Sequence, residues 1–97
     1  MILIFTIVLI ILLMTDWMQT RFISKHPELF SEINIILGVH PSLNAVNLYF
    51  SICIVATVIF SKLSPETLAI VVCSALIILE GFVTIRNYKN GVRMTLP

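Results

Sequence analysis

Three long apolar runs constrain the fold of this chain more than any other feature of its sequence. They cover residues 2–18, 43–63 and 67–85. Each approaches the roughly 20 helical residues that are needed to cross a hydrocarbon core of about 30 Å. No run shows the alternation of a barrel strand, and an open strand would leave backbone groups unpaired in lipid. The sequence therefore predicts an all-α, polytopic membrane protein with three transmembrane helices.

The charge content supports a lipid environment and excludes one class of partner. Of the 97 residues, 59% are hydrophobic and 11% are charged, whereas a soluble domain has roughly 25% charged residues. The six basic residues are spread along the chain and form no patch that could neutralise several phosphates. We therefore expect the lipid bilayer to be a partner of this chain and nucleic acid not to be one. The first apolar run lacks a basic start and a small-residue cleavage pattern, so we expect it to be retained.

Local signals set the expected helix boundaries within a single transmembrane domain over residues 1–97. Pro27 stops the first helix, Ser42 caps the second, and Ser64 is expected to cap the third with Pro65 in its first turn. Gly91 lies just beyond the expected end of the third helix. The expected helices are about 2–24, 43–63 and 65–88, followed by a tail at 89–97. The very short turn after residue 63 predicts an antiparallel hairpin of the second and third helices.

The connection at residues 25–42 has a mixed character. It is too polar to span a bilayer, yet it contains too many apolar side chains for a free loop. We expect a short interfacial or re-entrant segment that rests on the helices.

The distribution of basic residues predicts an orientation. With three spans, the 25–42 connection and the tail share one side of the membrane, and Lys62 alone lies near the other. The positive-inside rule then places the N-terminus outside and the C-terminus in the cytoplasm of a cell membrane. Five basic residues support this assignment: Arg21, Lys25, Arg86, Lys89 and Arg93. Three aromatic residues fit an interfacial belt: Trp17, Tyr49 and Tyr88.

Polar residues at one depth indicate a cluster near the cytoplasmic boundary. At 1.5 Å per residue, Asp16, Asn47 and Glu80 each lie about 7–9 Å inward of the same membrane boundary. Helical spacing places other polar side chains on the same faces. Exposure of a carboxyl group to lipid costs roughly 2.5–3.5 kcal/mol, so these faces should turn toward one another. The predicted cluster comprises Asp16, Gln19, Thr20, Glu32, Asn34, Asn44, Asn47 and Glu80, with Arg21 and Arg86 as interface charges.

Two roles for this cluster remain open at the sequence level. Its hydrogen bonds would fix helix register, because apolar packing alone is unspecific in lipid. Alternatively, Asp16, Glu32 and Glu80 would form an intramembrane cation or proton site. The spacing matches no metal motif, and the chain has no Gly-rich phosphate loop, GxSxG or HExxH. We therefore expect no enzyme activity, no cofactor and no metal centre.

One pattern extends over the first half of the chain and consists of Asp16-x-x-Gln19-Thr20, Glu32-x-Asn34, Leu37-Gly38-x-His40-Pro41-Ser42 and Tyr49-Phe50. This pattern resembles a family of small uncharacterised membrane proteins of bacterial and phage genomes. The resemblance implies that Asp16, Gln19, Thr20, Glu32 and Asn34 belong to one unit, and it implies a phage or prophage context. Ile35 stands where the family pattern has proline, so the turn after Asn34 is expected to differ.

Three functions follow as hypotheses. The first is a structural component of a bacterial inner membrane or a virion membrane that forms homo-oligomers or packs against a larger assembly. The second is a holin-like pore-forming protein of phage lysis, which the three spans and the predicted orientation resemble. The third is the intramembrane cation or proton site described above.

Overall fold

The chain folds into three long helices. The computed structural model describes residues 2–26, 28, 37–38 and 40–94, and these contain α1 (Ile2–Lys25), α2 (Leu43–Leu63) and α3 (Glu66–Lys89) with no strand. Each helix is long and apolar enough to cross a membrane. The predicted all-α fold class is therefore confirmed, and the chain is a small multi-pass membrane protein. The helices begin and end within one residue of the expected ranges.

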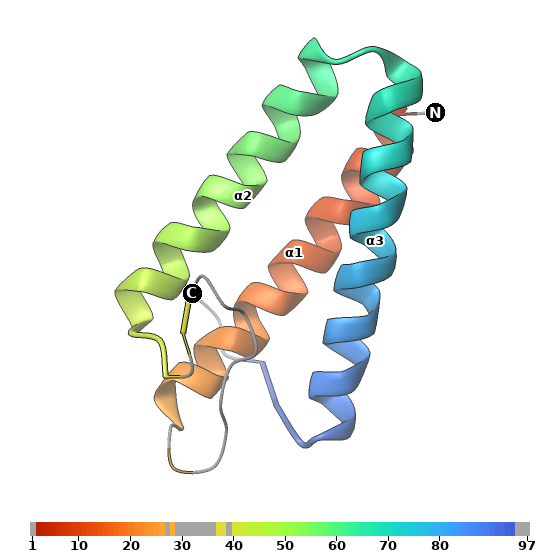
Figure 1. The fold of residues 1–97 in the computed structure, drawn as a ribbon. Helices are drawn as coiled ribbons and strands as arrows, with labels where there is room; N and C mark the ends of the chain where they lie inside the picture. The colour runs from red at the N-terminus through yellow and green to blue at the C-terminus, as the bar shows by residue number, and fades with distance from the viewer. Residues whose placement is uncertain (1, 27, 29–36, 39, 95–97) are drawn as a thin grey trace.

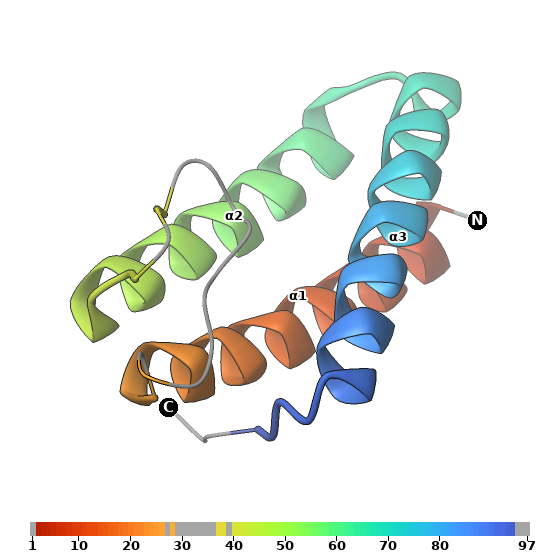
Figure 2. The ribbon, with the colours of Figure 1, turned by 60° about the horizontal axis from the view of Figure 1, so that its bottom comes forward.

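The first helix lies at the centre of the arrangement. Figure 1 shows α1 packed between the other two helices, and α1 contacts both of them extensively. By contrast, α2 and α3 contact each other little, and they separate as they leave their short connection (Figures 1 and 2). The predicted hairpin is therefore present, because α2 and α3 run in opposite directions and are joined by a short connection. Its two helices are held through α1 rather than by each other.

The apolar core follows the axis of α1 and remains narrow. Leu9 and Leu13 of α1 pack with Val46 and Phe50 of α2 and with Cys73 of α3. The described structure measures 44 × 25 × 22 Å, and many of its large apolar side chains are exposed. This surface is suited to contact with lipid, because a chain in a bilayer does not need to bury its apolar side chains.

Helix caps follow the sequence signals except at the start of α3. The Ser42 hydroxyl accepts a hydrogen bond from the Ala45 amide at 3.2 Å, which confirms the predicted cap of α2. Gly91 has a φ of +89° just after α3, a conformation that glycine adopts without a steric cost. The prediction for α3 was wrong by one residue, because Pro65 is its N-cap and Ser64 instead ends α2. The Ser64 amide donates to the Phe60 carbonyl at 3.0 Å, so the serine still belongs to the preceding helix.

Only the ends of the expected interfacial segment fall within the described residues. Residues 27, 29–36 and 39 lie outside them, and so do Glu32 and Asn34 of the predicted cluster. The described ends are held together because the Ser24 hydroxyl donates to the Pro41 carbonyl at 2.9 Å. The end of α1 therefore lies beside the start of α2.

Candidate functional site

Polar side chains join α1 to α3 at the end of the bundle that holds the predicted cluster. The Gln19 amide nitrogen donates to the Thr84 carbonyl at 3.1 Å, and its amide oxygen accepts from Asn87 at 3.1 Å. All three residues are buried, with exposed fractions of 7% or less. The nitrogen and the oxygen of the Gln19 side-chain amide are therefore both bonded to α3, which fixes the register between the two helices.

Two carboxyl groups meet one turn further into the bundle. Asp16 on α1 is 7% exposed, and its side chain interacts directly with that of Glu80 on α3. The Thr20 hydroxyl donates to the Asp16 carboxyl group at 3.1 Å. The Oε2 atom of Glu80 is buried and has no hydrogen-bond partner within the described part of the chain. Asp16 therefore has hydrogen-bonding neighbours, whereas Glu80 keeps one unpaired oxygen.

A second polar contact joins α1 to α2. The indole nitrogen of Trp17 donates to the side-chain oxygen of Asn47 at 3.0 Å, and the Arg21 guanidinium donates to the same oxygen. Arg21 is only 7% exposed, and its Nε atom has no partner among the described residues. The Trp17 ring also stacks near Phe50, with 6.3 Å between the ring centroids. Arg21 and Trp17 therefore both contact α2 inside the helix bundle.

The structure brings together only part of the predicted cluster. Asp16, Gln19, Thr20 and Glu80 surround the α1–α3 boundary, and Asn47 joins α1 to α2. Asn44 does not take part, because its side chain is exposed on the outer surface of α2. The physical reason is that α2 packs mainly against α1, so only a narrow face of α2 is buried. Arg86 is exposed near the end of α3.

Sequence reasoning missed two members of the site. Asn87 lies seven residues after Glu80 and three after Thr84, so the helical spacing could have placed it on their face. Trp17 gave no such signal, because an indole ring near a membrane boundary is typical of an interfacial anchor. Its hydrogen bond to Asn47 depends on which face of α1 turns toward α2, which the sequence does not specify.

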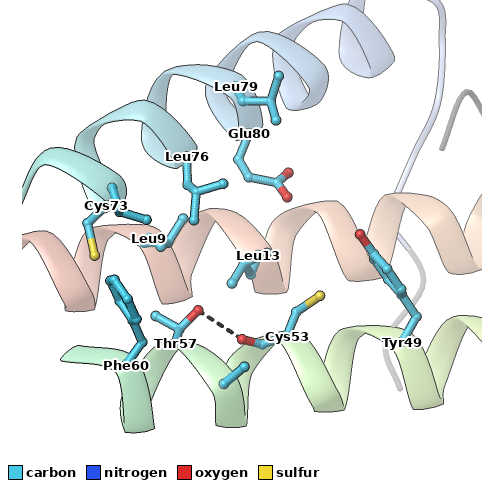
Figure 3. A pocket seen from close by; sticks show the side chains of 12 residues that line it. Leu9, Leu13, Tyr49, Cys53, Thr57, Phe60, Cys73, Leu76, Leu79 and Glu80 are labelled. Carbon is cyan, nitrogen blue, oxygen red and sulfur yellow. Dashed lines mark hydrogen bonds between the residues drawn. The ribbon is translucent and has the colours of Figure 1, made fainter. Parts of the chain in front are cut away.

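An open groove lies between α2 and α3, beside the carboxyl pair. Its volume is about 400 Å³, Leu9 and Leu13 of α1 form its floor, and Glu80 lies among its lining residues. The walls are largely apolar, with Tyr49, Cys53, Ala56, Thr57 and Phe60 from α2 and Val72, Cys73, Leu76 and Leu79 from α3. Figure 3 shows the Glu80 carboxyl group pointing from α3 into this space, with the Tyr49 ring extending from α2. The groove combines an apolar surface with one carboxyl group that has an unpaired oxygen.

The opposite end of the bundle has a single polar contact between helices among the described residues. The Thr6 hydroxyl donates to the Ser61 hydroxyl at 2.9 Å and also lies 2.8 Å from the Ile2 carbonyl.

A metal centre receives no support there or elsewhere, because no three His, Cys, Asp or Glu side chains gather as ligands in residues 2–26, 28, 37–38 and 40–94. Comparison with protein-family models, with curated proteins and with solved structures gave no match.

Proposed function

We propose that the protein is a structural component of a membrane that works as a homo-oligomer, with α2 as its self-association helix. The observation that carries this proposal is an exposed stripe on the outer surface of α2. Asn44, Leu48, Ser51 and Val55 follow one another at spacings of four, three and four residues, and all four side chains are exposed. This spacing is the one by which two helices pack along a shared seam in coiled coils and in membranes.

Two polar side chains within this stripe favour a second copy of the chain as the occupant. Neither Asn44 nor Ser51 makes a side-chain hydrogen bond within the described part of the chain, and Ser51 lies near the middle of α2. In a parallel, symmetric pair of α2 helices, each of these residues would face its own copy. Asparagine and serine side chains both donate and accept, so each can bond to itself across such a seam. Contact with lipid would leave the Ser51 hydroxyl without a partner on another helix.

The polar contacts around α1 support a structural role within each copy. They join α1 to both neighbours and leave the outer face of α2 free for a further chain. Because these polar side chains turn toward one another inside a single bundle, the arrangement favours an assembled component over a pore lined by polar stripes. The resemblance of Asp16-x-x-Gln19-Thr20 and its partner motifs supports a phage or prophage context for this component. The basic residues favour an outside N-terminus and a cytoplasmic C-terminus.

Cysteine cross-linking in native membranes tests the proposed seam. The native thiols Cys53 and Cys73 are first replaced by alanine, and Leu48→Cys is introduced in the stripe. Leu48 is 63% exposed, and Ile78 on the outer surface of α3 is 73% exposed, so Ile78→Cys provides a matched control. We expect mild oxidation to give disulfide-linked dimers of the Leu48→Cys protein and none of the Ile78→Cys protein.

The mass of the particle in mild detergent completes the test. A homo-oligomer should contain two or more copies of the chain and no other protein, and Ser51→Leu should shift the particle toward the monomer. A monomeric wild-type particle, equal cross-linking at both cysteines, or a particle built around a different protein would contradict the proposal.

A further inference from the structure

We propose that the groove between α2 and α3 binds an amphiphilic organic cation that carries a single positive charge, with the charge beside Glu80 and the apolar body against the groove walls. This site lies on a different face of α2 from the stripe at Asn44, Leu48, Ser51 and Val55. The inference therefore stands independently of self-association.

The size and lining of the groove suit a small amphiphilic molecule. Its volume of about 400 Å³ falls within the range of about 300–1,000 Å³ that is typical of small-molecule sites. Such sites are mostly apolar and contain few polar groups that fix the orientation of the ligand. Here Leu9 and Leu13 form an apolar floor and Phe60 extends the apolar wall, while Tyr49 on the Glu80 side of the groove adds an aromatic ring of the kind that attracts cations (Figure 3).

The unpaired oxygen of Glu80 indicates the charge of the ligand. This atom is buried without a hydrogen-bond partner in the described part of the chain, although its carboxyl group points into the groove (Figure 3). A buried polar atom without a partner is costly, and a carboxylate is most strongly compensated by a cation. The Glu80 carboxyl group that faces the groove can carry one negative charge, which matches a ligand with one positive charge.

Other occupants complement this groove less well. A lipid acyl chain would fill the apolar part but would give Glu80 neither a positive charge nor a hydrogen-bond donor. A second copy would bring its basic side chains to the wrong depth, because Arg86 follows Glu80 by about 9 Å along the helix and Lys62 lies at the opposite end of the bundle. Arg21, at the cytoplasmic end, already donates to Asn47. A free organic cation is the occupant that supplies both an apolar body and a charge at the depth of Glu80.

Equilibrium dialysis of the full chain in mild detergent tests the site with two probes of the same shape. The probes are tetraphenylphosphonium, which is a cation, and tetraphenylborate, which is an anion; protein-free micelles correct for partitioning into detergent. We expect saturable binding of one tetraphenylphosphonium per chain and no saturable binding of tetraphenylborate. Glu80→Gln should weaken phosphonium binding at least tenfold, whereas Glu66→Gln should leave it unchanged, because Glu66 is exposed at the start of α3.

A second variant separates the loss of the charge from a general loss of structure. Ala56→Phe would fill the groove from α2 while Glu80 remains in place, and it should abolish phosphonium binding with unchanged helical circular dichroism and particle mass. Equal binding by wild type and Glu80→Gln, equal binding of the two probes, or full binding by Ala56→Phe would overturn the proposal. It would also be overturned if a photoreactive side chain at Leu76 captured a phospholipid or a second copy that saturating phosphonium does not displace.

Discussion

At the boundary between α1 and α3, the Gln19 amide both donates to the Thr84 carbonyl and accepts from Asn87. Across the space between α2 and α3, by contrast, the described side chains are mostly apolar, and the Glu80 oxygen that faces them has no partner. In lipid, apolar side chains gain little by exchanging lipid contacts for protein contacts, so polar pairs decide which helices remain together. This comparison explains why α2 and α3 diverge although they are adjacent in sequence, whereas α1 and α3 remain packed together.

The polar contact between α1 and α2 should give the largest effect when it is removed. Asn47→Leu would leave the Trp17 indole and the buried Arg21 guanidinium without their shared acceptor. We expect a loss of about 3 kcal/mol in the free energy of unfolding, because a charged group without a partner costs more than a neutral one. Unfolding in mixed micelles by increasing fractions of a denaturing detergent measures this change. Asn47→Asp keeps an acceptor oxygen and should retain most of the stability; similar losses in both variants would show that the acceptor is unimportant.

The carboxyl pair between α1 and α3 should give an intermediate effect. Asp16→Leu would remove the acceptor of the Thr20 hydroxyl and the neighbour of Glu80, so we expect a loss of about 2 kcal/mol in the same unfolding measurement. Asp16→Asn should be tolerated, because the amide keeps much of the hydrogen bonding. If Asp16→Leu were as stable as the wild type, the contacts of Asp16 would not hold α1 to α3.

The single polar contact between helices at the opposite end of the described bundle should give the smallest effect. Thr6→Val keeps the shape of the side chain but removes the hydroxyl that donates to Ser61. We expect a loss of about 0.5 kcal/mol, which is close to the average value of one interhelical hydrogen bond in a membrane protein. Ser61→Ala provides the reciprocal change and should give a similar value. A loss as large as that of Asn47→Leu would remove the distinction between the two ends of the bundle.

The sequence predicts the helices well because their formation depends on local features. Each span is a long apolar run, the Ser42 cap is a local hydrogen bond, and Gly91 occupies a conformation that favours glycine. Membrane helices also satisfy their own backbone groups, so their ends depend little on neighbours. The start of α3 differs from the prediction by one residue, because only Ser64 and Pro65 separate the two helices and Ser64 belongs to the end of α2.

The candidate site is less predictable, because it depends on which face of each helix meets another. Asn44 and Asn47 are three positions apart on α2, yet Asn47 contacts α1 and Asn44 is exposed. The difference comes from the central position of α1, which leaves α2 with one main neighbour and a narrow buried face. The position of each residue along its helix axis can be predicted from residue numbers at 1.5 Å per position. The rotation of each helix about its axis cannot be predicted in this way. The groove beside Glu80 depends on that rotation and on the divergence of α2 and α3.

The central position of α1 also has a consequence for synthesis of the chain. Gln19 bonds to residues that lie 65 and 68 positions later in the sequence. Membrane helices are made in order, with the earlier segments emerging from the ribosome first. The polar face of α1 therefore waits beside lipid or the insertion machinery until the last helix arrives. A nascent chain truncated before Thr84 would therefore lack both hydrogen-bond partners of Gln19.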